Sequence, residues 1–428
     1  MHSLQRHARE AAAVAEGRIA PLAPTPEALG VCLVSGGSGF LGWHLVRMLA
    51  SLDGVSHVHV IDLYPAEASV SRDRPPPKNM TFWQGDVADA AFVESVVRRV
   101  QPETIFHSAS LIDLRPGVAS ARANDDINVE GTRTLIVLAR QYGARRLIYT
   151  SSIECAYHDN SCEEADEETT PYTAHPSNPY QRTKITAERE VLEASAPRSG
   201  LVTVAIRPAH IYGHLHDDEI GRFLEGVPAN FRAGLVMPDA SNVDGAPMSM
   251  VHVENCALAH VLAATQAHRF DVHGRAYFVR DFDENIVCVY RALAGRRPPI
   301  VCLPHWLLLV LVRVCMAAHL LVIFLTFGMF GVLQGKTGLH DGALAAALPC
   351  TVSSARAKRT LGYASYAGHV TREAAVASCV RPFVPLIDDT AVAAAVMQGC
   401  NRGKAGRDAS PVRRKASPVQ RKASPGRS

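Results

Sequence analysis

The chain lacks the cysteine patterns that build metal centres or disulfide frameworks. Ten cysteines are scattered singly along its 428 residues, with no C-x-x-C pair. Structural zinc sites and small disulfide-stapled domains both depend on closely spaced cysteines. The sequence therefore predicts no metal site, and it favours a reducing compartment.

Net charge is also small. The excess of Lys and Arg over Asp and Glu gives a formal charge of +3, which offers no argument for a nucleic-acid partner. The charge is uneven, because residues 399–428 are basic and repeat the unit ASPVRRK, and we predict a disordered basic tail there. Residues 1–28 are Ala-rich and lack a secretory hydrophobic region, and we predict a mobile N-terminal arm.

Formal charge is almost absent from residues 305–333, where Arg313 is the single charged residue. A bilayer span needs about 20 apolar residues, so this stretch is long enough for one span and too short for two. A buried core helix is the alternative. We expect a hydrophobic membrane-associated segment.

A glycine-rich turn stands near the start of the chain. An apolar run at 31–34 predicts a buried strand, and it is followed by Gly36, Gly39 and Gly42 and then by a helical pattern. Such a turn lets a pyrophosphate approach the backbone, and the helix N-terminus then stabilises the phosphates. The alternative is a glycine-rich turn without a ligand.

A second strand at 55–62 ends in Asp62, twenty residues after Gly42. An acidic residue there accepts hydrogen bonds from the adenosine ribose, and this favours NAD over NADP. The third strand leads to Asp86. An acidic residue in this position either faces the adenine edge of the cofactor or caps the helix that follows, and the sequence leaves both interpretations open.

Strands and helices continue to alternate up to residue 213, which predicts a parallel sheet. Among these elements we expect an amphipathic helix at 127–143 and an acidic loop at 162–179. The expected fold class is α/β, a Rossmann-type doubly wound sheet with a smaller C-terminal substrate domain. We place the NAD-binding domain at 29–213 and a substrate-binding region at 214–398. Beyond 213 we expect a strand and a helix within 248–266, a strand at 274–281, and helices at 282–297, 353–363 and 369–380.

Tyr180 and Lys184 are four residues apart, so they lie on one face of the predicted helix. A lysine ammonium beside a phenol stabilises the phenolate and lowers its pKa, and a serine at a strand end can polarise the reacting oxygen. A surface helix with an incidental tyrosine and lysine is the alternative.

Several motifs together resemble one family: GGSGFLG, GDVAD, IFHSAS, NVEGT, YTSSIE, YQRTK, RPAHIYG and MVHVENCALAH. Over residues 31–380 the chain resembles an extended short-chain dehydrogenase/reductase of the 3β-hydroxysteroid dehydrogenase family, which includes the sterol-4α-carboxylate 3-dehydrogenases. Tyr157 departs from the family pattern, because a small residue often follows the serine strand there.

The resemblance implies roles for individual residues. Tyr180 would be the acid/base and Lys184 its partner, Ser152 would polarise the C3 oxygen beside Ser151, and Asn128 would hold the geometry of the site. The implied cofactor contacts are Gly36, Gly39, Phe40, Leu41, Gly42, Asp62, Asp86, Val87, Ser108, Lys184, Pro208 and Ile211.

The implied reaction is oxidation of a 3β-hydroxyl on a steroid or sterol, with decarboxylation or Δ5 isomerisation as possible companions. The alternatives are a nucleotide-sugar epimerase or reductase of the same fold and a non-catalytic NAD-binding membrane scaffold. The expected partners are the sterol, membrane lipid and a second copy of the chain. The expected location is the endoplasmic reticulum membrane, with the catalytic domain facing the cytosol.

Overall fold

The computed structural model describes residues 28–65, 76–113, 117–158, 161–213, 236–238, 247–285, 301–303, 307, 310, 314 and 349–365. The expected arm, apart from Ala28, lies outside this part of the chain, and so do the basic tail and the helix expected at 369–380. The hydrophobic stretch 305–333 is described only at residues 307, 310 and 314. Within the described residues, no helix has the length and apolar character that a bilayer crossing requires.

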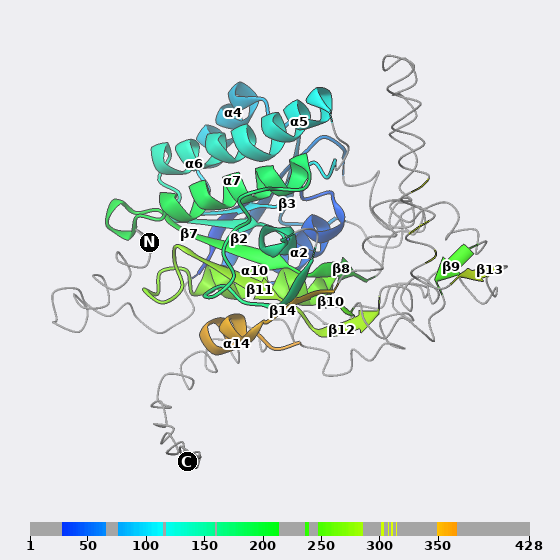
Figure 1. Ribbon diagram of the computed structural model, residues 1–428. Coiled ribbons are helices and arrows are strands. Elements are labelled where there is room, and N and C mark those ends of the chain that lie inside the picture. The colour runs from blue at the N-terminus through cyan, green and yellow to red at the C-terminus, as the bar shows by residue number, and fades with distance from the viewer. Residues whose placement is uncertain are drawn as a thin grey trace, which may run out of the picture.

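The centre of the molecule is a seven-stranded sheet in which every pair of neighbours is parallel (Figure 1). The strand order is β11-β7-β5-β4-β1-β2-β3. The chain runs outward from β1 to β3 and then returns to β4 on the other side of β1. This reversal opens a crevice at the carboxyl ends of β1 and β4, where ligands of such sheets bind. The strands are β1 (Gly30–Ser35), β2 (Val55–Asp62), β3 (Met80–Gln84), β4 (Thr104–His107), β5 (Arg146–Thr150), β7 (Val202–Pro208) and β11 (Arg275–Val279).

Helices cover both faces of this sheet, as the sequence predicts. On one face lie α4 (Ala90–Val100), α6 (Gly131–Gln141) and α7 (Pro179–Ala194), and on the other lie α2 (Phe40–Ala50) and α10 (Val253–Thr265) (Figure 1). Two apolar cores result, one on each side of the sheet. The helix expected at 127–143 begins as a π-helical turn, η1 (Asp125–Glu130), which continues α5 (Val118–Asn124) into α6.

A smaller mixed sheet forms the second part of the fold. Its order is β12-β10-β14-β6, and β8 pairs with β10 outside this path. The helix α14 (Ala355–Leu361) follows β14. A separate pair joins β9 (Val236–Pro238) to β13 (Val301–Leu303). The strands of the small sheet are β6 (Cys162–Ala165), β8 (His210–Tyr212), β10 (Pro247–His252), β12 (Phe282–Asn285) and β14 (Cys350–Val352).

Two sequence-based expectations are wrong in this region. The predicted helix 282–297 begins instead as strand β12, because residues 282–285 pair antiparallel with β10, and residues 286–297 lie outside the described part. The acidic segment at 162–165, read as a loop, forms strand β6 by pairing with β14. In both cases a long-range partner strand decides the structure, and local sequence carries no signal of it.

Candidate active site

The glycine turn between β1 and α2 borders the crevice. Gly36 has a left-handed φ of +72°, and a side chain there would lie 2.6 Å from the backbone nitrogen of Ala109. A side chain at Gly42 would collide with the Gly36 carbonyl oxygen. Glycine is therefore required at both positions, the first for its conformation and the second for the close packing of helix on strand.

A cleft of about 590 Å³ lies beside this turn. Six of the predicted cofactor residues line it: Gly36, Gly39, Asp62, Asp86, Val87 and Ser108. Sequence reasoning missed Ser38, Leu63, Tyr64, Ser110, Leu111 and Ile127, which also line the cleft. Most of these residues lie within a few positions of a strand end. That position in the sequence could have identified them as residues that line the cleft. A glycine turn, a helix N-terminus and an acidic strand end around one cleft fit a dinucleotide.

Asp62 is fixed beside the turn. One carboxylate oxygen accepts a hydrogen bond from the Ser38 backbone nitrogen at 2.9 Å, and the other accepts one from Tyr64 at 3.3 Å. Asp86 lines the cleft and accepts a bond from Ala88 at 2.9 Å. The N-cap of α4 is Asp89, so the interpretation of Asp86 as the cap is wrong.

The other predicted cofactor contacts do not line this cleft. Leu41 is buried in the core, Phe40 packs against the same core, and Gly42 lies against the turn. Pro208 ends β7, and Ile211 pairs with Val251 of β10. Their contact with a nicotinamide stays a prediction.

The structure brings Ser152, Tyr180 and Lys184 together. Asn178 caps α7 by accepting a bond from the Gln181 backbone nitrogen at 2.8 Å, and the helix then presents Tyr180 and Lys184 to the sheet. The Ser152 hydroxyl lies close enough to the Tyr180 phenol to influence its pKa. The Lys184 ammonium donates to the Thr150 carbonyl oxygen at 2.8 Å.

Lys184 is enclosed by aromatic rings as well. Its Nζ lies 4.9 Å from the ring centroid of Tyr149 and 5.7 Å from that of Tyr180. The side chain is only 2% exposed. Burial lowers the pKa of Lys184 to about 8, and the negative charge of Glu188, one helical turn further on, opposes that shift.

The pKa of Tyr180 differs from the sequence-based expectation. Burial and the nearby Glu154 raise it above the ordinary value, while the neighbouring Ser152 hydroxyl lowers it. In the protein alone the net effect is therefore a raised pKa, because removal of water from the phenol dominates, and the lowered pKa expected from the Tyr180–Lys184 spacing is not found.

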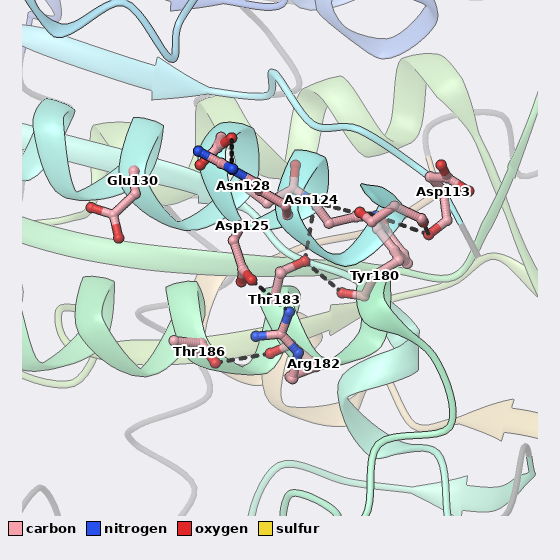
Figure 2. A network of polar contacts seen from close by, with 12 residues as sticks. Asp113, Asn124, Asp125, Asn128, Glu130, Tyr180, Arg182, Thr183 and Thr186 are labelled. Carbon is pink, nitrogen blue, oxygen red and sulfur yellow. Dashed lines mark hydrogen bonds and ion pairs between the residues drawn. The ribbon is translucent and has the colours of Figure 1, made fainter. Parts of the chain in front are cut away.

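Asn128 joins three elements around the site. Its amide oxygen accepts from the Leu111 nitrogen at 2.7 Å and from Ser110 at 3.1 Å, and its amide nitrogen donates to the Leu111 carbonyl oxygen at 2.9 Å. The same nitrogen lies 3.1 Å from Thr183 Oγ1 on α7, and Thr183 in turn donates to the Tyr180 carbonyl oxygen (Figure 2). Asn128 thus ties the wall of the cleft to the helix that carries Tyr180.

A buried ion pair next to this group was missed by sequence reasoning. Arg207 Nε donates to a Glu188 carboxylate oxygen at 2.9 Å, and Glu188 is fully buried. The Tyr172 hydroxyl also donates to this carboxylate. The spacing of Tyr180, Lys184 and Glu188, four residues each, was the signal that could have identified it.

Tyr157, the departure from the family pattern, is half-buried. Its carbonyl oxygen accepts from Gln181 Nε2 at 3.1 Å, and its hydroxyl lies near the Cys350 thiol of β14. Burial and this thiol raise the pKa of the phenol. The side chain therefore links the segment after Ser152 to the small sheet.

Comparison with known proteins finds relatives in sequence and in fold. The human 3 beta-hydroxysteroid dehydrogenase type 7 is 35% identical over 301 residues, covering 66% of this chain and 78% of the relative. The decarboxylating sterol-4-alpha-carboxylate 3-dehydrogenase of Saccharomyces cerevisiae is 30% identical over 253 residues, covering 58% and 69%. The NAD complex of UDP-glucose 4-epimerase from Thermus thermophilus shares the fold, with a TM-score of 0.54 at 22% identity over 86% of this chain and 98% of that one.

Residues 33–294 match the model of the 3-beta hydroxysteroid dehydrogenase/isomerase family, which is more than half of the chain. The chain therefore belongs to the 3-beta hydroxysteroid dehydrogenase/isomerase family and is an oxidoreductase that acts on CH–OH groups.

Proposed function

We propose that the protein oxidises the 3β-hydroxyl of a sterol to a 3-ketone with NAD. The observation that carries the proposal is the group formed by Ser152, Tyr180 and Lys184, held together at the carboxyl ends of the strands. A hydroxyl, a phenol and an ammonium in contact are the groups that proton transfer to and from an alcohol requires.

In this reaction Tyr180 takes the proton of the 3β-hydroxyl through its phenol oxygen. Ser152 donates a hydrogen bond to the same substrate oxygen and holds it next to Tyr180. Lys184 stabilises the phenolate form by its charge, and Thr150 and Tyr149 hold the ammonium in place. A bound NAD would supply the hydride acceptor, held by the glycine turn and Asp62.

NAD is the proposed cofactor because Asp62 stands at the end of β2 and lines the cleft. A carboxylate there binds ribose hydroxyls and repels the 2′-phosphate of NADP. The Ser38 backbone nitrogen already orients this carboxylate toward the turn.

A 4α-carboxysterol is the substrate we favour, because the product would be a β-keto acid, which loses carbon dioxide without another catalyst. Isomerisation of a Δ5 double bond needs a further acid/base group, and we propose no residue for that role. Purified protein with NAD should convert a 4α-carboxy-3β-hydroxysterol to a ketone with release of carbon dioxide. Turnover of a UDP-sugar instead would favour the epimerase, and no turnover of either substrate would favour the scaffold.

We also propose that the stretch 305–333 inserts into a membrane and returns to the side it came from. Support comes from the small sheet, where β12 precedes the stretch in sequence, β14 follows it, and both pair with β10. A single crossing would put these two strands on opposite sides of the bilayer.

The proposed location is the endoplasmic reticulum, with the catalytic part in the cytosol. On sealed microsomes, tags at both ends should be equally sensitive to protease. Protection of one tag alone would contradict the same-side topology, and extraction by high salt would contradict insertion.

A further inference from the structure

Two cysteines from distant parts of the chain meet in the small sheet. Strands β6 and β14 pair in parallel, with Cys350 opposite Cys162. Neighbouring strands lie about 4.8 Å apart, and a disulfide joins Cα atoms roughly 4.4–6.8 Å apart. Both side chains are thiols, and the Cys162 thiol donates a hydrogen bond to the Thr351 carbonyl oxygen of β14 at 3.5 Å. Their spacing therefore meets the main geometric requirement of a disulfide.

The surroundings of this pair make Cys350 the better nucleophile. The neighbouring Cys162 thiol and Tyr157 hydroxyl lower the pKa of Cys350 below its ordinary value. The pKa of Cys162 is raised instead, by the neighbouring Cys350 and by burial. The thiolate is the form of cysteine that reacts with oxidants.

Two other described cysteines, Cys32 and Cys155, lack this arrangement. Burial raises the pKa of both Cys32 and Cys155, to about 12 for Cys155. The Cys32 thiol hydrogen-bonds to backbone carbonyl oxygens, and the Cys155 thiol hydrogen-bonds to Ser151. Neither of these bonds goes to a second thiol, so neither cysteine has a partner ready for a disulfide.

The pair also lies close to an edge that can open. Strand β6 is the last in the order β12-β10-β14-β6, and the two glutamates that follow Cys162 are exposed. Edge strands open locally at lower free energy than central strands, and a small oxidant can then enter.

We propose that Cys162 and Cys350 form a redox-active dithiol that hydrogen peroxide converts to an intramolecular disulfide. The Cys350 thiolate attacks one peroxide oxygen, the O–O bond breaks, and a sulfenic acid and hydroxide form. The Cys162 sulfur then attacks the Cys350 sulfur and expels hydroxide. Its own proton and the proton that Cys350 had lost neutralise the two hydroxides. In total two thiols lose two electrons and two protons, and one peroxide becomes two water molecules.

Such a bond would close a long loop. It would tie the segment that follows Ser152 to the strand that follows the hydrophobic stretch 305–333. Because a cross-link over so many residues removes much of the freedom of the unfolded chain, thermal stability should rise. An increase in Tm on the order of 5 °C is expected for the oxidised protein.

The test is peptide mapping of the full-length protein before and after treatment with hydrogen peroxide. The expected result is a linked pair of peptides that contain Cys162 and Cys350, with a mass two hydrogens lower, which dithiothreitol reverses. Cys162→Ser should abolish the linked pair and the increase in Tm. Cys256→Ala, which removes a buried thiol elsewhere, should retain both.

Peptide mapping of the wild-type protein alone shows whether Cys162 and Cys350 become linked. The test therefore does not depend on a variant that folds poorly. Both thiols still free for alkylation after peroxide treatment, or either one joined to a different cysteine, would overturn the proposal.

Discussion

Replacement of Asn128 by alanine should weaken the fold and the catalytic group together. Five polar contacts of the Asn128 side chain would be lost, two at its oxygen and three at its nitrogen. Thr183 and Asn124 retain other hydrogen bonds. The backbone nitrogen and oxygen of Leu111 lose their hydrogen bonds to the Asn128 amide. An unsatisfied buried polar group costs about 1–3 kcal/mol, so the free energy of unfolding should fall by about 2–4 kcal/mol.

Asn128→Asp gives a sharper test of the same network. The carboxylate can still accept from the Leu111 nitrogen, but its second oxygen would face the Leu111 carbonyl oxygen and the Asn124 side-chain oxygen. We expect at least as large a loss of stability at neutral pH as for alanine. Relative to wild type at the same pH, that loss should shrink as the pH falls, because a protonated Asp can donate where the amide did.

The assay is urea unfolding together with kcat for each variant. Thr186→Val is the control, because it removes one bond on the same helix, to the Arg182 carbonyl oxygen, and it should change stability by under about 1 kcal/mol. Wild-type stability and kcat in Asn128→Asp would refute the argument that Asn128 positions α7.

Four further results are expected. Tyr180→Phe should lower kcat by about 10²–10⁴-fold with little change in NAD affinity, because the ring stays and the acid/base oxygen is lost; near wild-type kcat would exclude it as the base. Activity should decline as the pH rises through about 8, where Lys184 loses its proton. The Tyr149 ring stabilises the ammonium, so Tyr149→Leu should move this decline about one pH unit lower, whereas Tyr149→Phe should leave it in place. Identical pH profiles for both variants would contradict this role of the ring. The free energy of unfolding should fall as the pH drops from about 6.5 toward 4. Burial lowers the pKa of His107 to about 3 and that of His260 to about 4, so these histidines take up protons in the unfolded chain before they do so in the folded protein. A free energy of unfolding that stays constant over this range would contradict the prediction. Asp62→Ala should reduce the ratio of kcat/KM for NAD to that for NADP, and a wild type that prefers NADP would contradict the proposed role of Asp62.

Local sequence was enough to predict the glycine turn, the strands of the large sheet and the spacing of Tyr180 and Lys184. Each rests on short-range physics: glycine tolerates a left-handed φ, parallel strands are apolar runs, and residues four apart share a helix face. In the structure Asp62 and Ser108 line one cleft, because parallel strands bring their carboxyl ends to one edge.

Long-range pairing could not be predicted in the same way. Nothing local makes residues 282–285 a strand, and the contact of Cys162 with Cys350 exists only because β6 and β14 adjoin. The pKa of Tyr180 was misjudged for a related reason. Burial depends on all the elements packed around the phenol, whereas the sequence shows only its lysine neighbour.

The central claim is that hydride leaves C3 of a 3β-hydroxysterol at the site that contains Tyr180. The most direct measurement uses a 3β-hydroxysterol that carries deuterium on C3, incubated with NAD and the purified protein, with mass analysis of both products. We expect a 3-ketone without the label and a reduced nicotinamide that carries it, with no transfer in Tyr180→Phe. Label retained on the sterol, or transferred equally well by Tyr180→Phe, would contradict it.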